Sequence, residues 1–133
     1  MIEIEEFLLV AEAVLGVDAD RLSHMARIAG AESALAAPFA SFDGHEFYEQ
    51  PVQRAAVLAS RIMRNHPLPD GNKRIALILM ELYLEQEGLR LVAAPTDIDN
   101  VFRAVAGRTM GEADFCTWLT AHTESSRSAE CTE

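Results

Sequence analysis

The chain has 133 residues, half of them hydrophobic, and its 21 Asp and Glu residues outnumber its 11 Lys and Arg residues, for a formal net charge of −10 at pH 7. This length is typical of one domain that buries its own core. The acidic balance argues against broad electrostatic binding to nucleic acid or to an anionic membrane, because both partners are themselves negative. An anionic ligand must therefore be captured by a local group of positive charges.

The cysteines and the N-terminal residues bear on cellular location. Two cysteines, Cys116 and Cys131, are too few for a disulfide framework or a zinc cluster, which fits a reducing cytosol. The chain begins MIEIEEF, which is acidic where a secretory signal is basic, and its longest apolar run, residues 75–80, is too short to span a bilayer. We therefore expect a cytoplasmic protein that does not enter the membrane.

The apolar spacing of the first part of the chain is helical. Hydrophobic residues recur at i, i+3, i+4 and i+7 through residues 4–15, which predicts a first helix that ends near Gly16. A second helix is expected from about Asp20 until Gly30 interrupts it. A short alanine-rich turn follows at residues 31–37.

The helical period breaks at residues 38–49. Here Asp43 and Gly44 form a strong turn signal between aromatic residues, which predicts a loop or a small hairpin. The period returns over residues 48–65, and His66 is the next position on the apolar face of that helix.

The helix predicted for residues 71–87, with Gly88 as its C-terminal stop, is apolar almost all round. A helix of this kind is usually the buried centre of an α-helical domain. A short extended piece follows at residues 89–93. Thr96 and Asp99 then have the spacing of a capping box at the start of another helix.

The predicted organisation is one all-α domain over residues 1–122, a helical bundle around the buried helix with the short hairpin before it. Its last helix is expected at residues 112–122. Residues 123–133, TESSRSAECTE, are polar, and we expect them to form a disordered tail.

The junction before the buried helix carries a distinctive run of residues. Residues 66–74 read HPLPDGNKR and include the chain's only lysine. The first turn of a helix leaves backbone N–H groups without partners, and with the macrodipole these groups form an anion site. Five of the 11 Lys and Arg residues lie in this part of the chain: Arg54, Arg61, Arg64, Lys73 and Arg74. The first three read as a solvated face, whereas the last two fall at the helix start, where positive charge favours a bound anion.

The residue types at this helix start suit phosphate chemistry. Asp70 is expected to cap the helix and to hold Mg²⁺, which usually takes one or two carboxylates together with substrate phosphates. Gly71 would let a ligand approach the backbone closely. Asn72, Lys73 and Arg74 bring hydrogen-bond donors to the same turn.

His66 lies beside this turn and could accept the proton of an attacking hydroxyl. A histidine at the end of a helix is more often a simple cap, but its neighbours make that the weaker interpretation here. The chain has neither a P-loop signature nor the protein-kinase set of glycine-rich loop, HRD and DFG. A nucleotide enzyme with this sequence therefore belongs to another class.

Residues 66–74 resemble the signature of the Fic/Doc family, which reads H-x-F-x-[DN]-[AG]-N-K-R in its Doc, or death-on-curing, branch. The resemblance extends to the order of predicted elements over about residues 31–122. It implies that His66 activates the hydroxyl of a target protein and that Asp70 is the Mg²⁺ ligand. It also implies that the next residues bind the phosphates of ATP: Gly71, Asn72, Lys73 and Arg74.

Two positions bear on which phosphorus atom is attacked. The Fic branch usually has glycine at the place of Lys73 and a further arginine at the place of Leu77. In the Doc branch these differences are associated with a reversed ATP, whose γ-phosphate faces the acceptor, so the resemblance favours a kinase. Leu68 stands where the family usually has phenylalanine, and its effect on the loop is left open.

The resemblance implies partners as well. Residues 39–49 would be a flap that holds the target chain, with Phe42, His45 and Phe47 as its candidate contacts. The implied function is that of a toxin, restrained by a cognate antitoxin, that phosphorylates a bacterial protein and arrests translation. By family analogy the best candidate target is elongation factor Tu. Two alternatives stay open: AMP or other nucleotidyl transfer by the same fold, and a non-catalytic binding module.

Overall fold

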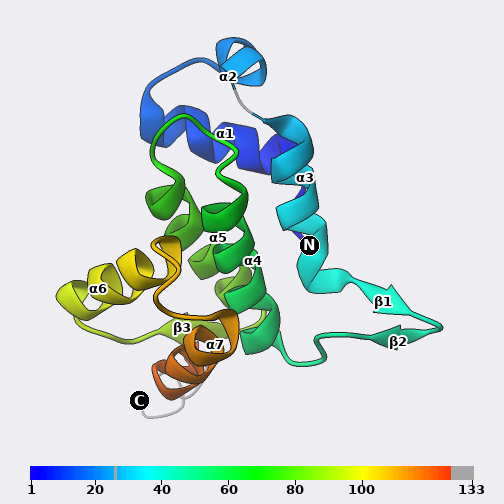
Figure 1. Ribbon diagram of the computed structural model, residues 1–133, viewed down its shortest axis with the longest axis vertical. Coiled ribbons are helices and arrows are strands. Elements are labelled where there is room, and N and C mark those ends of the chain that lie inside the picture. The colour runs from blue at the N-terminus through cyan, green and yellow to red at the C-terminus, as the bar shows by residue number, and fades with distance from the viewer. Residues whose placement is uncertain (26, 127–133) are drawn as a thin grey trace.

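The computed structural model describes residues 1–25 and 27–126, and it is a bundle of helices with two small antiparallel β-pairs (Figure 1). The prediction of an all-α fold is confirmed. The α-helices in the described residues are α1 (Ile4–Leu15), α2 (Ala19–Met25), α3 (Ile28–Ala36), α4 (Pro51–Asn65), α5 (Asn72–Gln86), α6 (Pro95–Ala106) and α7 (Glu112–Ala121). The other elements are the 3-10 turn η1 (Ala37–Phe39) and the strands β1 (Ser41–Phe42), β2 (His45–Glu46), β3 (Leu89–Leu91) and β4 (Thr123–Ser125).

Helices α4 and α5 make the most extensive contact and form the centre of the bundle. The buried face of α4 is rich in small side chains, among them Ala55, Ala56 and Ala59, which let neighbouring helices approach closely. Helix α4 packs against α3, α6 and α7 as well as α5, while α5 also contacts α1. The two central helices thus bring the loop between them to a fixed place in the bundle.

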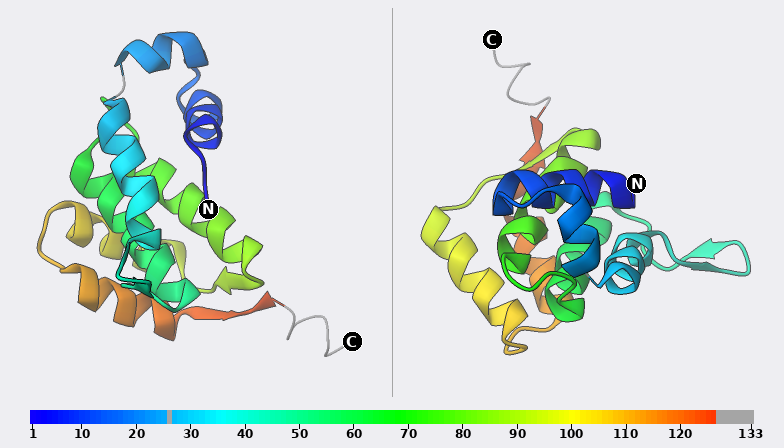
Figure 2. Two further views of the ribbon diagram at one scale, coloured as in Figure 1. Left: turned by 90° about the vertical axis from the view of Figure 1, so that its right-hand side faces the viewer. Right: turned by 90° about the horizontal axis from the view of Figure 1, so that it is seen from above.

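The predicted turn at Asp43 and Gly44 is confirmed as a β-hairpin. Strands β1 and β2 pair with Phe42 opposite His45, and both turn residues have positive φ, 52° and 79°, as a two-residue hairpin turn requires. The hairpin projects from the body on the side opposite α6, as both Figure 1 and the right-hand view of Figure 2 show.

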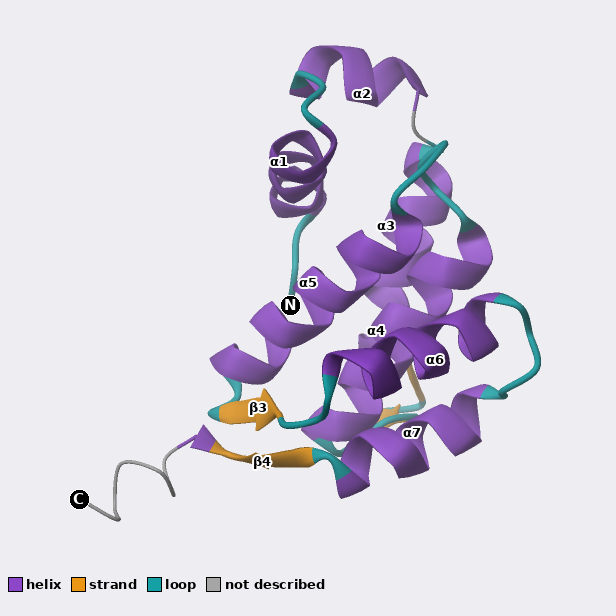
Figure 3. Ribbon diagram, turned by 90° about the vertical axis from the view of Figure 1, so that its left-hand side faces the viewer, coloured by secondary structure: helices purple, strands orange, loops and turns teal. Residues whose placement is uncertain are grey.

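The second β-pair lies at the C-terminal end of α5, beside α7 (Figure 3). Strand β4 pairs with β3, Leu91 opposite Thr123, and Arg90 and Glu124 form an ion pair across it. Residues 123–125, which were assigned to the polar tail, are therefore part of the ordered fold. Residues 127–133 of the predicted tail lie outside the described residues.

The helix expected from Asp20 to Gly30 is two helices. Gly30 lies inside α3, and the interruption comes earlier, where Arg27 precedes the helix and its N–H donates to the Pro67 carbonyl at 2.7 Å. Asn65 Nδ2 donates to the Gly30 carbonyl at 3.0 Å, so α3 lies close to the C-terminal end of α4. Over the described residues, no helix combines the length and apolar character needed to cross a membrane.

Candidate functional site

The loop from α4 to α5 begins at a residue with unusual backbone geometry. Helix α4 ends at Asn65, and its C-cap is His66, whose backbone is left-handed, φ 49° and ψ 56°, and whose N–H donates to the Ile62 carbonyl at 3.1 Å. Glycine is the usual residue here, because positive φ disfavours a side chain. Such strained positions concentrate at functional sites. The exposed side chain of His66 lines the main cleft of the protein.

Leu68 and Asn72 hold this loop to the body. The Leu68 N–H donates to Asn72 Oδ1 at 3.0 Å, and Asn72 Nδ2 donates to the Leu68 carbonyl at 2.8 Å. Both residues are buried, and the Leu68 side chain belongs to the hydrophobic core. Leucine thus anchors the loop where phenylalanine is usual. The Asn72 side chain, which the sequence predicts to bind phosphate, forms hydrogen bonds to the loop backbone and lines the cleft.

Gly71 is the N-cap of α5, with φ 79°. A Cβ at this position would lie 2.7 Å from Leu15 Cδ2 at the end of α1. The absent side chain therefore makes room for α1, and Gly71 also lines the cleft, where a ligand is expected. Asp70 precedes the N-cap and does not cap the helix as expected. Its Oδ1 accepts from the Gly71 N–H at 2.8 Å.

The first turn of α5 presents unused donors. The earliest loop-to-helix bond runs from the Ile75 N–H to the Gly71 carbonyl, and among the described residues nothing accepts from the N–H groups of Asn72, Lys73 and Arg74. The side chains of Lys73 and Arg74 are exposed and form no ion pair within the described part of the chain. Helix start and side chains together make a positive site that can bind an anion.

The three arginines of α4, which the sequence predicts to form a solvated face, are half-buried and pair with acidic side chains of the protein. Arg61 and Arg64 lie 3.0 and 3.8 Å from Glu112 of α7, and this contact raises the pKa of Arg61 against the opposing effect of burial. Arg54 pairs with Glu46 of β2, and its guanidinium stands over the ring of Phe39. None of the three lines the main cleft.

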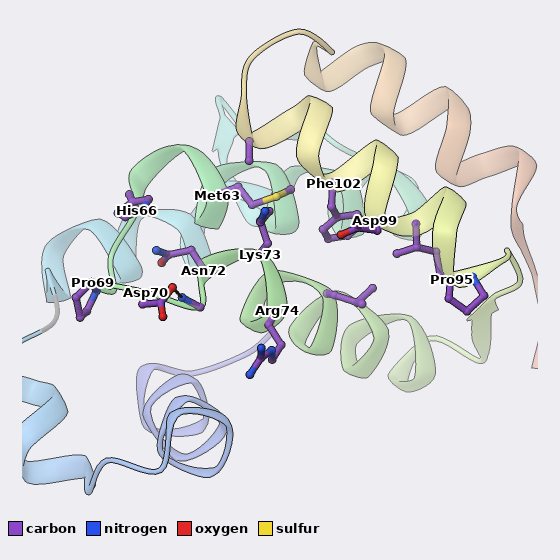
Figure 4. A pocket seen from close by; sticks show the side chains of 14 residues that line it. Met63, His66, Pro69, Asp70, Asn72, Lys73, Arg74, Pro95, Asp99 and Phe102 are labelled. Atoms are coloured by element: carbon purple, nitrogen blue, oxygen red, sulfur yellow. Dashed lines mark hydrogen bonds between the residues drawn. The ribbon is translucent and has the colours of Figure 1, made fainter.

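The main cleft has a volume of about 770 Å³ and lies between the start of α5 and one side of α6. Its residues come from the end of α4, from the loop, and from α5 and α6: Met63, His66, Pro69, Asp70, Gly71, Asn72, Lys73, Arg74, Leu77, Pro95, Ile98, Asp99, Phe102 and Ala106. Figure 4 shows His66 and Asp70 at one end, Lys73 in the middle, and Pro95, Asp99 and Phe102 at the other end. The cleft is thus polar at the loop and largely apolar against α6.

Asp70, the expected Mg²⁺ ligand, fits a metal site with a single protein carboxylate. Asp70 is exposed, and one of its oxygens has no hydrogen-bond partner among the residues that the structure describes. Within residues 1–25 and 27–126 there is no group of three or more His, Cys, Asp or Glu side chains that could hold a metal ion. The donor set therefore fits Mg²⁺ carried largely by phosphates and water with one protein carboxylate, and does not fit a cage made by the protein alone.

The expected flap is present but lies away from the cleft. Phe42 and Phe47 are 73% and 62% exposed, His45 is exposed, and none of the three lines the cleft. The hairpin joins the N-terminal end of α4, whereas His66 is at its C-terminal end, a separation of roughly 22 Å for 15 residues. In this conformation the structure does not bring the flap residues together with the motif.

Sequence reasoning missed the α6 wall of the cleft. The sequence predicts a helix here and uses Asp99 only as part of a capping box at its start. The structure starts α6 at Pro95, with Ala94 as its N-cap and no side-chain cap, so Asp99 falls in the second turn and is free to line the cleft. The one signal in the sequence was that Asp99, a polar residue, lies at the margin of the apolar face of this helix.

Comparison with known proteins gives two matches. The model of the Fic/DOC family matches residues 4–84, which include the whole of residues 66–74. Toxin Doc of Mycolicibacterium smegmatis is 38% identical over 68 residues, which are 51% of this chain and 52% of the toxin. The matching region thus spans about half the length of that relative. No solved structure matches the chain.

Proposed function

The chain belongs to the Fic/Doc family, and on that premise we propose that it is a Doc-like protein kinase. In this proposal it transfers the γ-phosphate of Mg·ATP to a serine or threonine hydroxyl of a bacterial protein. The observation that carries the proposal is that positive groups and an exposed imidazole line the same cleft. Lys73, Arg74 and the free N–H groups of the α5 start line the same cleft as His66.

Each residue has a defined task in this reaction. His66 accepts the proton of the target hydroxyl while the hydroxyl oxygen forms a bond to the γ-phosphorus. The bond from that phosphorus to the β–γ bridging oxygen breaks, and ADP leaves with the electron pair. Lys73 and the α5 N–H groups hold the phosphate oxygens where negative charge shifts during transfer. Asp70 would hold Mg²⁺, which supplies charge neutralisation on the phosphates.

The shape of the cleft favours phosphate transfer over AMP transfer. A triphosphate seated on the positive end lies beside His66, and the apolar end offers space for the nucleoside away from it. The last phosphate is then the one nearest the imidazole. Leu77 supports this direction, because it places an apolar side chain in the cleft where the Fic branch usually has a phosphate-binding arginine.

The biological role follows the named relative. Toxin Doc belongs by its name to the toxins, and we propose that this chain is also the toxin of a toxin–antitoxin pair, acting in the cytoplasm. A cognate antitoxin would then restrain it. Elongation factor Tu is the first target to test, because its modification would arrest translation.

The test is a labelling experiment with purified translation factors, elongation factor Tu among them. The protein is incubated with Mg·ATP labelled at the γ position or, separately, at the α position, and covalent label on each factor is measured. We expect label from the γ position only, and its loss in His66→Ala and Asp70→Ala. His24→Ala is the matched control, since it removes another exposed histidine, which lies outside both the cleft and the flap.

The outcomes separate the alternatives. Covalent label from the α position would show nucleotidyl transfer by the same site. No label from either position with any factor, combined with growth arrest that persists in His66→Ala, would favour a non-catalytic binding module. Either result would overturn the proposed kinase.

A further inference from the structure

Two hydrogen bonds connect the end of α4 to the start of α3, and His66 lies between them. On one side, Asn65 Nδ2 donates to the Gly30 carbonyl at 3.0 Å. On the other side, the Arg27 N–H donates to the Pro67 carbonyl at 2.7 Å. The residue before His66 and the residue after it are therefore both held by the first turn of α3 and its N-cap.

We propose that these two hydrogen bonds are a brace that holds the His66 imidazole in its reactive position, with Asn65 as a positioning residue that acts through His66. The inference rests on the proposed function, because it takes His66 as the group that accepts the proton of the target hydroxyl. It gives a role in the reaction to α3, a helix whose residues do not line the cleft.

The backbone of His66 shows why a brace is needed. Its φ of 49° is in the left-handed region, which glycine occupies readily and a residue with a side chain disfavours. A residue in such a conformation stays there only when its surroundings determine it. Helix α4 contributes the bond from the His66 N–H to the Ile62 carbonyl, but the helix ends at Asn65. Beyond that point the bonds to α3 supply the constraint.

The brace is separate from the contacts that hold the rest of the loop. Leu68 and Asn72 bond to each other and fix the loop relative to the start of α5. The brace instead fixes residues 65–67 relative to α3. Neither Asn65 nor Arg27 lines the cleft. Loss of the brace should therefore move the imidazole and leave the phosphate site in place.

Gly30 allows the hydrogen bond to be separated from the packing of the two helices. A Cβ at Gly30 would lie 3.8 Å from the Asn65 Cβ and from its carbonyl oxygen, which is ordinary contact. Gly30→Ala therefore keeps the carbonyl that accepts the bond, whereas Asn65→Ala removes the donor. An effect of the brace should appear in the second variant and not in the first.

The first experiment compares these two variants with the wild-type protein. Single-turnover transfer from γ-labelled Mg·ATP is measured on the translation factor that the wild-type protein labels, and Mg·ATP binding is measured by calorimetry. We expect Asn65→Ala to slow transfer about 10- to 100-fold, since a small misplacement of a reacting group has effects of this size, and to keep the Kd for Mg·ATP within about twofold. Gly30→Ala should change neither quantity.

Arg27 offers a second matched pair of variants. Proline has no backbone N–H and holds φ at about −65°, close to the −85° of Arg27, and it is tolerated at the start of a helix. Arg27→Pro therefore removes the bond to the Pro67 carbonyl, whereas Arg27→Ala keeps that bond and removes only the exposed side chain. We expect slower transfer in Arg27→Pro and an unchanged rate in Arg27→Ala.

The NMR signals of the histidines test the brace without any activity. The chain has four histidines, and comparison with His66→Ala identifies the signals of His66. In Asn65→Ala the imidazole and amide signals of His66 should shift or broaden, because its backbone then leaves the left-handed conformation for part of the time. The signals of the other three histidines should stay in place.

Thr123→Val is the control for a general loss of stability. It removes the hydrogen bond from Thr123 Oγ1 to the Leu119 carbonyl, 2.6 Å, which is half-buried like that of Asn65 but lies outside the cleft and the loop. This variant should keep the wild-type transfer rate and the wild-type signals of His66.

Three outcomes overturn the brace: an unchanged transfer rate or unchanged His66 signals in Asn65→Ala, an equal loss of rate in Thr123→Val, or a loss of Mg·ATP binding that parallels the loss of rate. In each case labelling by the wild-type protein leaves the proposed kinase standing. A wild-type protein that labels no factor overturns the kinase instead, and the His66 signals alone then decide whether the brace holds the imidazole.

Discussion

Asn72 and Leu68 are joined by a closed pair of hydrogen bonds, in which the asparagine side chain pairs with both backbone groups of the leucine, at 3.0 and 2.8 Å. The pair is buried and spans the loop between His66 and the start of α5. The two hydrogen bonds hold the loop in one conformation. They therefore fix the distance between the His66 imidazole and the positive start of α5, which both line the cleft. Asn72 is therefore a positioning residue for the proposed reaction.

Asn72→Ala should destabilise the loop between α4 and α5. Two buried hydrogen bonds are lost and the Leu68 N–H and carbonyl are left without partners, so the free energy of unfolding should fall by about 2 to 4 kcal/mol. Urea unfolding measures this change, and hydrogen exchange should show faster opening at residues 67–71. If Asn72→Ala instead keeps full stability but no longer binds ATP, its amide contacts the ligand directly.

Gly71→Ala tests why the helix begins with glycine. The new Cβ would stand 2.7 Å from Leu15 Cδ2, and the backbone would be held at φ 79°, so we expect a loss of about 1 to 3 kcal/mol in the free energy of unfolding. The double variant Gly71→Ala with Leu15→Ala relieves the clash but not the backbone strain. It should therefore be less destabilised than the sum of the two single variants. Additive effects would show that Leu15 is not in contact with this position.

The sequence predicts regular elements well and their junctions less well. The hairpin turn at Asp43 and Gly44 and the start of α5 follow from local chemistry, since both depend on residues next to each other. The break before α3 does not, because it depends on the Arg27 N–H finding the Pro67 carbonyl, 40 positions away in the chain. Gly30, which locally weakens a helix, is accepted because α3 packs against the end of α4.

The site shows the same division. The motif of residues 66–74 identifies which residues gather, because they are neighbours along one loop and one helix turn. It does not reveal that the Asn72 side chain bonds to Leu68 or that Gly71 faces Leu15, since both are consequences of packing. The α6 wall comes from residues that follow α5 and β3, and only the tertiary fold brings Asp99 into the same cleft as Lys73.

Lys73→Gln should have opposite effects on stability and on binding. Without a ligand, the lysine opposes the dipole at the start of α5, so its removal should raise the free energy of unfolding by about 0.3 to 1 kcal/mol. With Mg·ATP or tripolyphosphate, the same change removes a cation from the phosphate site and should weaken binding about tenfold at low salt. Thermal unfolding with and without ligand measures both effects in one series.

The control for this prediction is Arg90→Gln on β3, which removes a cation that pairs with Glu124 outside the cleft. It should lower stability slightly or not at all and leave ligand binding unchanged. If Lys73→Gln weakens binding no more than Arg90→Gln does, the lysine acts only through the overall charge of the protein.

The flap leads to the last prediction. If the target chain pairs with the hairpin edge and also reaches His66, it must span roughly 22 Å along α4, or about seven extended residues. Replacing Phe42 and Phe47 by aspartate should then reduce modification of the whole target severalfold while ATP binding stays unchanged, because neither residue lines the cleft. A peptide of four or five residues around the acceptor hydroxyl is too short to reach the flap, so its slower modification should be insensitive to the same change. Equal loss of modification for the peptide and the whole target, or a parallel loss of ATP binding, would mean that the two phenylalanines support the fold and do not hold the target.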